Sequence, residues 1–480
     1  MQRVQEREVT FEVDQGWAVP DLSGLGYAFQ TAIEELEATY HDTEDGQLRR
    51  LGVTVRRRVG GADPGWVLMA GDGVARTEIR SQARRETVPD SLARRLAGVL
   101  AGRELRPVAV ISTTRRTSRL VDSAGALAVQ VADDSISGAS LGESSTLDRW
   151  REIEVELGPA GTERHLTKIT RLFAEAGILP SSSQLKLDRL LGGPLSPADL
   201  GEPDEVGRLV SAYVVDQCAA ILRGDILLRD QAAVEVVHRT RVAIRRLRSV
   251  LRTLPELFAG ADEDLDATRT TLDGDLRWLA GVLGDIRDGD VVARRVLDEL
   301  EQLPPEDVLG PVAREIRETA AADRRTATQR WHASWTDAPY ARIMITLATW
   351  HTRPPIATGA SVKPKRVLKK ARRRVERRLV DAHGDPNALH GARKAAKRLR
   401  YTAELFTDLV PKAAATADRA KQIQTRLGDH QDLVVAAAFL RRLGAHYGSA
   451  EGHNGFTYGV LLARVEHQAA QLRVAAAPDH

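Results

Sequence analysis

The sequence predicts an α+β multidomain protein in which an antiparallel β-barrel is followed by an all-α helical bundle with an internal duplication. In the first ~195 residues, short segments alternate apolar and polar side chains, as half-buried strands do. From residue 207 onward, long stretches of Ala, Leu, Arg and Glu are typical of helices. The pattern HRTRVAIRRLR at residues 238–248 returns as HGARKAAKRLR at residues 390–400, which indicates a repeat.

A chain of 480 residues is too long for one hydrophobic core. We expect a barrel domain at residues 1–195, a linker rich in Pro, Gly and acidic residues at 196–206, and a helical domain at 207–475. The single cysteine, Cys218, excludes an internal disulfide and fits a reducing compartment. The charged start resembles no signal peptide, and no apolar run approaches the roughly 20 residues of a membrane span. These features predict a cytoplasmic protein without a membrane partner.

Charge is distributed unevenly along the chain. Residues 205–480 contain 44 Lys and Arg against 35 Asp and Glu, so they carry +9 and the preceding part carries −6 of the net +3. Residues 363–378 alone hold ten Lys or Arg and one Glu, which favours a polyanionic partner. Aromatic residues make up only 4% of the chain. This disfavours single-stranded nucleic acid, whose bases usually stack on aromatic side chains.

The expected elements of the first part follow from its alternation and its turn residues. We expect strands at residues 6–13, 51–59, 65–70, 74–80, 108–122, 127–133 and 151–157. Helical interruptions are expected at residues 28–38, 90–101 and 163–176. Seven or eight antiparallel strands around one core indicate a barrel or curled sheet.

Acidic residues share one face of the first and of the last expected strand. Glu6 and Glu8 share one face of the first segment and Val9, Phe11 and Val13 share the other, while Glu152, Glu154 and Glu156 alternate with apolar residues in the last. For one strand alone, a solvated acidic face is the better interpretation. Carboxylate oxygens, however, are hard ligands suited to Mg²⁺ or Mn²⁺.

Basic residues share strand faces in the same part of the chain. Arg56 and Arg58 lie on one face of their segment, and Arg76 and Arg80 lie on one face of another. Guanidinium groups suit phosphate oxygens. If the acidic and basic faces all point into a barrel, its interior can bind a metal–phosphate chain.

Together, several segments resemble the CYTH family, the triphosphate tunnel metalloenzymes, which are related to thiamine triphosphatase and class IV adenylate cyclase. The resemblance covers residues ~1–195 and rests on ExE at residues 6–8, YHDTEDGQLRRLGVTVRRRVGGADPGWVL (40–68), RTEIR (76–80), ELRPVAV (104–110) and WREIEVEL (150–157). It implies an eight-stranded tunnel in which a metal-activated water attacks the terminal phosphorus. By position, metal would be held by Glu6, Glu8, Glu152, Glu154 and Glu156, and phosphate by Arg56, Arg58, Arg76 and Arg80.

The sequence departs from this family at three positions where lysines are usual. Thr10 stands at the end of the ExExK signature, Met69 at the end of GWxLK, and Gln184 within the S-K-L pattern, where Lys186 is a substitute if the register slips. Each lost contact to phosphate would cost about 1.5–3 kcal/mol. A weak enzyme, an altered substrate and an inactive binding module are the alternatives.

The repeated basic pattern forms a narrow stripe when drawn as a helix. His238, Arg241, Arg245 and Arg248 fall within about 80° of one another. The second copy places His390, Arg393, Lys397 and Arg400 at the same offsets, with Arg398 matching Arg246. A solvated charged face is the usual interpretation of one such helix. Because like charges on one stripe repel, two copies indicate a bound anion.

A second motif follows each copy: LGDIRDGDV at residues 283–291 and LGDHQDLVV at residues 427–435. Asp288 and Asp432 correspond, and we interpret them as structural groups that cap helices or position arginines. Helices are expected at residues 207–223, 231–254, 264–283, 290–302, 306–331, 338–350, 362–382, 387–407, 413–428, 431–444 and 455–474.

Residues ~205–475 are similar to the CHAD family, the conserved histidine α-helical domain. The similarity rests on VVHRTRVAIRRLRSVLR, LRWLAGVLGDIRDGDV, LHGARKAAKRLRYTAELF and RLGDHQDLVV, which occur in the family's order. It implies two related helical bundles that meet across a basic groove for inorganic polyphosphate. By position, the groove would be lined by His238, Arg241, Arg245, Arg246, Arg248, His390, Arg393, Lys397, Arg398 and Arg400, with Lys394 as a weaker candidate.

The two resemblances lead to one main hypothesis and one alternative. The main hypothesis is a polyphosphate-binding protein whose metal-dependent tunnel hydrolyses tripolyphosphate or a related triphosphate. The alternative is a catalytically inactive polyphosphate-binding or granule-targeted protein, which would associate with polyphosphate granules. Nucleic-acid binding, which follows from charge alone, ranks below both.

Overall fold

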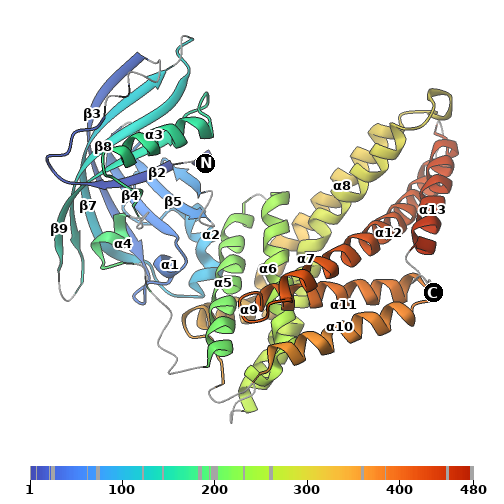
Figure 1. Cartoon of the computed structure of the whole chain (residues 1–480). Helices are drawn as coiled ribbons and strands as arrows, with labels where there is room; N and C mark the ends of the chain where they lie inside the picture. The colour runs from blue at the N-terminus through green and yellow to red at the C-terminus, as the bar shows by residue number, and fades with distance from the viewer. Residues whose placement is uncertain are drawn as a thin grey trace. The chain divides into compact units, whose positions relative to one another are not determined.

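A computed structural model of the chain divides into two compact units, Met1–Pro197 with Asp225–Leu227, and Ala198–Gly224 with Leu228–His480 (Figure 1). Each unit is described below by itself. The structure describes all residues except 1, 7, 21, 23–27, 62, 72–75, 122–123, 143–144, 182–185, 194, 196–203, 231–232, 259–262, 358–361, 384, 450–452 and 476–480. The side chains of residues 2–6, 28–31, 76, 263 and 473–475 also lie outside the description.

The first unit is built on one antiparallel sheet. Its strands among the described residues are β1 (Gln2–Glu6), β2 (Glu8–Val13), β3 (Ala28–Asp42), β4 (Thr54–Gly60), β5 (Gly65–Gly71), β6 (Arg76–Ser81), β7 (Arg106–Val121), β8 (Leu127–Ser140) and β9 (Leu147–Leu157). Its helices are α1 (Gln47–Arg50), α2 (Asp90–Leu100), α3 (Glu163–Glu175) and α4 (Lys186–Leu190). The strand order is β1-β6-β5-β4-β3-β7-β8-β9-β2.

The two edges of this sheet are held by consecutive stretches of chain. β1 pairs with β6 at one end of the order, and β2 pairs with β9 at the other. Because a single residue separates β1 from β2, the sheet closes on itself, and β1 and β2 act as two segments of one strand. The predicted antiparallel barrel is confirmed.

One expected element of this unit was wrong. Residues 28–38, predicted to be helical, belong to the long strand β3, which pairs with β4 on one side and β7 on the other. Ala, Glu and Leu favour a helix in isolation. In the barrel, the backbone N–H and C=O groups of this segment form hydrogen bonds with β4 and β7. That strand pairing outweighs the local helix propensity.

The apolar faces of the strands at the closure point pack outward. Phe11 of β2 and Ile153 of β9 are fully buried in a cluster with Phe173 of α3. The ring centroids of Phe11 and Phe173 lie 4.4 Å apart. Successive side chains point to opposite faces of a strand, so the glutamates that alternate with these apolar residues face the interior of the barrel.

The second unit is helical, as predicted. Its α-helices among the described residues are α5 (Glu205–Leu228), α6 (Val234–Thr253), α7 (Glu263–Leu300), α8 (Val312–Ala333), α9 (Ala338–Thr352), α10 (Pro364–Val380), α11 (Pro386–Leu405), α12 (Ala413–Gly448) and α13 (Phe456–Ala475). None of the described helices is long and apolar enough to cross a membrane.

The duplicated motifs are adjacent in this unit. α6 packs against α7, α11 packs against α12, and α6 also packs against α11 (Figure 1). At that contact, Oγ of Ser249 in α6 donates to the carbonyl oxygen of Arg398 in α11, at 3.4 Å. The two basic stripes therefore belong to neighbouring helices.

Two helix boundaries were predicted wrongly. Residues 264–283 and 290–302 belong to the single helix α7, and residues 413–428 and 431–444 belong to α12. In α7, buried Leu283 and Ile286 continue the apolar stripe across the expected gap. Packing of such a stripe outweighs the roughly 1 kcal/mol that a glycine costs within a helix.

Candidate functional sites

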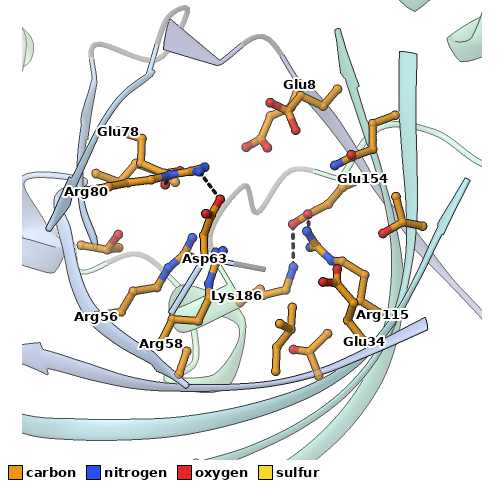
Figure 2. A pocket seen from close by; sticks show the side chains of 18 of the residues that line it. Glu8, Glu34, Arg56, Arg58, Asp63, Glu78, Arg80, Arg115, Glu154 and Lys186 are labelled. Atoms are coloured by element: carbon orange, nitrogen blue, oxygen red, sulfur yellow. Dashed lines mark hydrogen bonds and ion pairs between the residues drawn. The ribbon is translucent and has the colours of Figure 1, made fainter. Parts of the chain in front are cut away.

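The interior of the barrel is a cavity of about 680 Å³ with a strongly charged lining (Figure 2). The cationic residues that line it are Arg56, Arg58, Arg80, Arg115, Arg119 and Lys186. The acidic residues that line it are Glu8, Glu34, Asp63, Glu78, Glu154 and Glu156. In Figure 2, Glu8 and Glu154 lie toward one side and Arg56, Arg58 and Arg80 toward the other.

The sequence-predicted residues are distributed as follows. The cavity is lined by Glu8, Glu154, Glu156, Arg56, Arg58 and Arg80, together with Met69 at a usual lysine position. Glu152 is buried and is absent from the described lining. The side chains of Glu6 and Arg76, and the whole of Gln184, lie outside the described residues. Thr10 faces Glu154 across the β2–β9 ladder.

A pair of carboxylates faces the cavity where β2 meets β9. Glu8 and Glu156 are direct partners in the register of these strands. Burial raises the pKa of Glu156, and the neighbouring charges of Glu154 and Glu78 raise it further. Like charges directly opposite each other are unfavourable in a sheet. Oxygen ligands in such surroundings fit a divalent cation such as Mg²⁺ or Mn²⁺.

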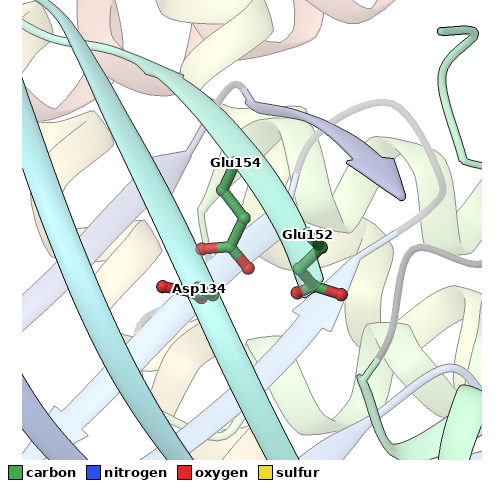
Figure 3. A group of neighbouring side chains, drawn as sticks. All are labelled: Asp134, Glu152 and Glu154. Carbon is green, nitrogen blue, oxygen red and sulfur yellow. The ribbon is translucent and has the colours of Figure 1, made fainter. Parts of the chain in front are cut away.

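A second group of carboxylates lies on β8 and β9 (Figure 3). Asp134, Glu152 and Glu154 offer oxygen atoms within 4.8 Å of one another, close enough that they could hold a metal ion. In this structure Nζ of Lys186 lies among them, 2.9 Å from Asp134 and 2.5 Å from Glu154, and it also pairs with Glu152. Arg115 adds ion pairs at 2.6 Å to Asp134 and 2.5 Å to Glu154.

The pKa values of this group follow from the pairing. Burial alone would raise the pKa of Glu154, but Lys186 and Arg115 outweigh it and hold that pKa well below its usual range. Burial of Lys186 would likewise lower the pKa of its ammonium, and the surrounding carboxylates instead raise it. Burial raises the pKa of Glu152, whose carboxylate accepts a hydrogen bond of 3.0 Å from Nε1 of Trp150. Lys186 thus already supplies a cation to these three carboxylates.

The short helix α4 places Lys186 in this position. Leu187 and Leu190 of α4 are buried in an apolar cluster with Ile111, Ile136 and Trp150. Asp188 anchors the helix to the barrel through an ion pair of 2.9 Å with Arg49. With α4 held at both points, its first residue is directed to the carboxylates.

On the basic side, Arg58 differs from its neighbours. Burial and the nearby charge of Arg56 lower the pKa of Arg58 to about 10. Arg56 instead donates a hydrogen bond of 3.2 Å to the hydroxyl of Tyr40. Arg80 pairs with Glu78 and, at 2.8 Å, with Asp63. A phosphate group close to Arg58 would relieve the repulsion that it experiences.

Three cationic residues of the cavity, Arg115, Arg119 and Lys186, were not in the set predicted from the sequence. Arg115 belongs to the alternation of Thr113, Arg115, Thr117 and Arg119, and this polar face of β7 is the signal that could have identified it. Lys186 was named only as a substitute for the missing lysine at Gln184. Its position depends on the packing of α4, for which the sequence carries no periodic pattern.

The helical unit has a basic cavity of about 390 Å³. Its described lining comes from α6, α7 and α11 and consists of Arg245, Arg248, Ser249, Arg252, Arg277, His390, Arg393, Lys394, Lys397, Arg398 and Tyr401. None of these residues is acidic. Residues from both copies of the repeated motif thus line one cavity.

Arg248 and Arg252 of this cavity pair with Asp273, at 3.0 and 2.5 Å, whereas other cations of the lining repel one another. Burial lowers the pKa of Lys397 to about 8, with a further contribution from Arg393 and Arg245. The pKa of Arg398 is lowered by burial and then by nearby arginines. The pKa of His390 is lowered by burial and by Lys394. An anion in the cavity would remove this repulsion.

Four of the predicted groove residues are absent from the described lining of this cavity: His238, Arg241, Arg246 and Arg400. Arg246 and Arg400 both pair with Glu404, at 3.3 and 2.7 Å. Three cations that do line the cavity were not in the predicted set: Arg252, Arg277 and Lys394, which had been the weaker candidate. Arg252 lies seven residues after Arg245, on the same helix face, which is a signal that the stripe continues.

The two copies of the motif differ in the partner of the histidine. In the second copy, Nδ1 of His390 lies 3.0 Å from Oε1 of Gln431. In the first copy, Arg287 occupies the position that corresponds to Gln431. Burial lowers the pKa of His238, and Arg287 lowers it further. The arginines are more alike: Arg241 pairs with Asp288 at 2.7 Å, and Arg393 pairs with Asp432 at 3.9 Å.

Comparisons with known proteins agree with this division. Residues 5–191 match the CYTH domain family and residues 212–441 match the CHAD domain family. Two uncharacterized proteins from strains of Mycobacterium tuberculosis are 32% identical over 490 residues, covering 95% of this chain and 92% of theirs.

Solved structures with lower identity are also similar. PptA from Streptomyces chartreusis is 19% identical with a TM-score of 0.48, covering 56% of this chain and 97% of that one. The CHAD domain from the plant Ricinus communis is 23% identical with a TM-score of 0.44, covering 59% of this chain and 95% of that one. From the two domain matches and the full-length relatives, the chain belongs to the family of proteins that fuse a CYTH domain to a CHAD domain.

Proposed function

We propose that the protein binds linear inorganic polyphosphate in the cavity lined by α6, α7 and α11. The observation that carries this proposal is the lining itself, which combines eight Lys or Arg residues and one His with no described carboxylate. The lowered pKa of Lys397 supports it, because burial and neighbouring cations destabilise its ammonium until an anion binds.

Polyphosphate fits this cavity better than a nucleic acid. Polyphosphate carries about one charge per phosphate and no bases. A site made of guanidinium and ammonium groups can therefore pair with all of its polar groups. Single-stranded nucleic acids usually require aromatic surfaces for stacking, whereas Tyr401 is the one aromatic residue in the described lining.

The test is binding of long-chain polyphosphate to the full chain, measured by titration calorimetry at several salt concentrations. Arg245→Ala with Lys397→Ala should weaken binding by about 10²-fold or more, since each charge-assisted contact contributes about 1.5–3 kcal/mol. The slope of log affinity against log salt should become shallower. The matched control is Arg239→Ala with Lys421→Ala, which removes the same charges from exposed positions outside the lining. Equal affinity of both variants would refute the proposal.

The barrel cavity supports a second function, metal-dependent hydrolysis of tripolyphosphate or a related triphosphate. Glu8 and Glu156 would hold Mg²⁺ or Mn²⁺, and the bound metal would supply an acidified water as nucleophile. Arg56 and Arg58 would hold the phosphate oxygens. Thr10, Met69 and Gln184 replace usual lysines, and for this reason we expect slow turnover.

This second function is tested by phosphate release from tripolyphosphate with each metal. Glu8→Gln with Glu156→Gln should abolish release, while Glu37→Gln, an exposed residue of β3, should leave it unchanged. If the wild-type chain releases no phosphate but binds long polyphosphate, the barrel is an inactive binding module, which is the alternative function.

A further inference from the structure

The basic helix α10 is not accounted for by either cavity. Its residues Arg366, Lys370, Arg374 and Arg378 are spaced four apart, so they form one ridge along the helix. At 1.5 Å per residue the ridge is about 18 Å long. The first three of these side chains are exposed and Arg378 is half-buried.

This ridge adjoins the basic cavity of the helical unit. α10 packs along α11, as Figure 1 shows, with Leu368 and Val375 buried. Nη1 of Arg378 donates to the carbonyl oxygen of Gly391, at 3.2 Å, beside the start of the basic stripe of α11. Arg374 and Arg378 are also close enough to Arg398, a lining residue, to lower its pKa. Cations therefore continue from the cavity onto α10.

The charge of the ridge is not balanced within its own helix. Glu376 is the one acidic residue in α10, and it pairs with Arg372, which is not part of the ridge, at 3.3 Å. Like charges four residues apart destabilise a helix. A linear polyanion along the ridge would convert this repulsion into binding.

We propose that the α10 ridge extends the anion site, so that a bound polyphosphate chain leaves the cavity past Arg398 and continues along Arg374, Lys370 and Arg366. This inference rests on the proposed polyphosphate binding and adds a preference for long chains. A short phosphate would fill the cavity and never reach the ridge. Nucleic acid is a poorer occupant, because α10 contains no aromatic residue on which bases would stack.

The test compares two double variants of the full chain that remove equal charge from one helix. Lys370→Ala with Arg374→Ala acts on the ridge, and Lys365→Ala with Lys369→Ala acts on residues of α10 outside the ridge. All four positions are exposed, so both variants should retain the fold, which circular dichroism verifies. Binding of long-chain polyphosphate and of tripolyphosphate is measured for each.

The ridge variant should bind long-chain polyphosphate about tenfold more weakly, the change expected from losing at least one charge-assisted contact. Its affinity for tripolyphosphate should be unchanged, and the control should match the wild type with both ligands. Equal effects of the two double variants, or equal effects on long and short chains, would overturn the inference while leaving the cavity as a binding site.

Failure of the proposed function has a different signature, since the wild-type chain would then not bind long-chain polyphosphate. A further arm uses single-stranded DNA. If the ridge variant loses affinity for this DNA and keeps its affinity for long-chain polyphosphate, α10 is a nucleic-acid surface and the proposal is wrong.

Discussion

Arg241 of α6 lies against Gly284 of α7. A Cβ atom added to Gly284 would be 3.0 Å from Nη2 of Arg241. The second copy repeats this relationship, since a Cβ on Gly428 would lie 3.2 Å from Nη2 of Arg393. In both copies the glycine gives the guanidinium space beside the helix. Each glycine weakens its own helix by about 1 kcal/mol relative to Ala, and its occurrence in both copies indicates that the position of the arginine matters.

Replacing Gly428 with Leu should therefore displace Arg393, which lines the basic cavity. We expect polyphosphate affinity to fall about tenfold, the effect of one lost charge-assisted contact, although the substitution improves helix propensity. Gly281→Leu in α7 is the control, because nothing lies within 4 Å of a Cβ there. Equal affinity of the two variants in titration calorimetry would contradict this role for Gly428.

Replacing Lys186 with Ala should destabilise the barrel. The change leaves Asp134, Glu152 and Glu154 buried with one cation fewer, and breaking such a group costs about 3–5 kcal/mol. At pH 8 the melting temperature of the full chain should fall. At pH 5 the loss should be smaller, because burial raises the pKa of Glu152, which without Lys186 gains a proton as the pH falls. Lys168→Ala, an exposed residue of α3, is the control, and a loss independent of pH would count against this account.

Binding of polyphosphate should depend on pH through Lys397. The pKa of about 8 in the free protein should rise when an anion binds, so binding takes up a proton near that pH. Affinity should fall about tenfold or more between roughly pH 7 and pH 9.5, if the pKa returns to about 10.4 in the complex. Calorimetry in buffers of different ionisation enthalpy measures the proton uptake.

The matched variant for this effect is Lys397→Arg, whose guanidinium stays charged throughout that range. Its affinity should be nearly independent of pH. A wild-type chain with equally flat affinity would show that Lys397 does not face the ligand.

The two carboxylate groups of the barrel should respond differently to Mn²⁺. Glu8→Gln with Glu156→Gln should lose Mn²⁺ binding, measured by electron paramagnetic resonance of the free ion. Glu152→Gln should retain most of it, because Lys186 already lies beside that carboxylate and Trp150 donates to it. The reverse ranking would move the metal to the group of Asp134, Glu152 and Glu154.

Alternation in the sequence was sufficient to group many side chains of the barrel cavity. Glu8, Glu154 and Glu156 line it, as do Arg56 and Arg58, because a strand turns every second side chain to the same face. Glu152 shares the face of Glu154, as the rule predicts. It is nevertheless buried beside Trp150 and Lys186 and is absent from the described lining of the cavity, and this depends on neighbours distant in sequence.

By itself, the sequence determined the two fold classes, the order of the domains and the repeated cationic stripe, since all three follow from the local periodicity of side chains. Tertiary structure decided which residues meet. It made residues 28–38 a strand, joined the expected helix pairs into α7 and α12, and brought Arg277 of α7 to the cavity of α6 and α11. The packing of α4 also placed Lys186 beside Asp134, Glu152 and Glu154. These outcomes depend on pairing and burial between distant segments, which no local pattern encodes.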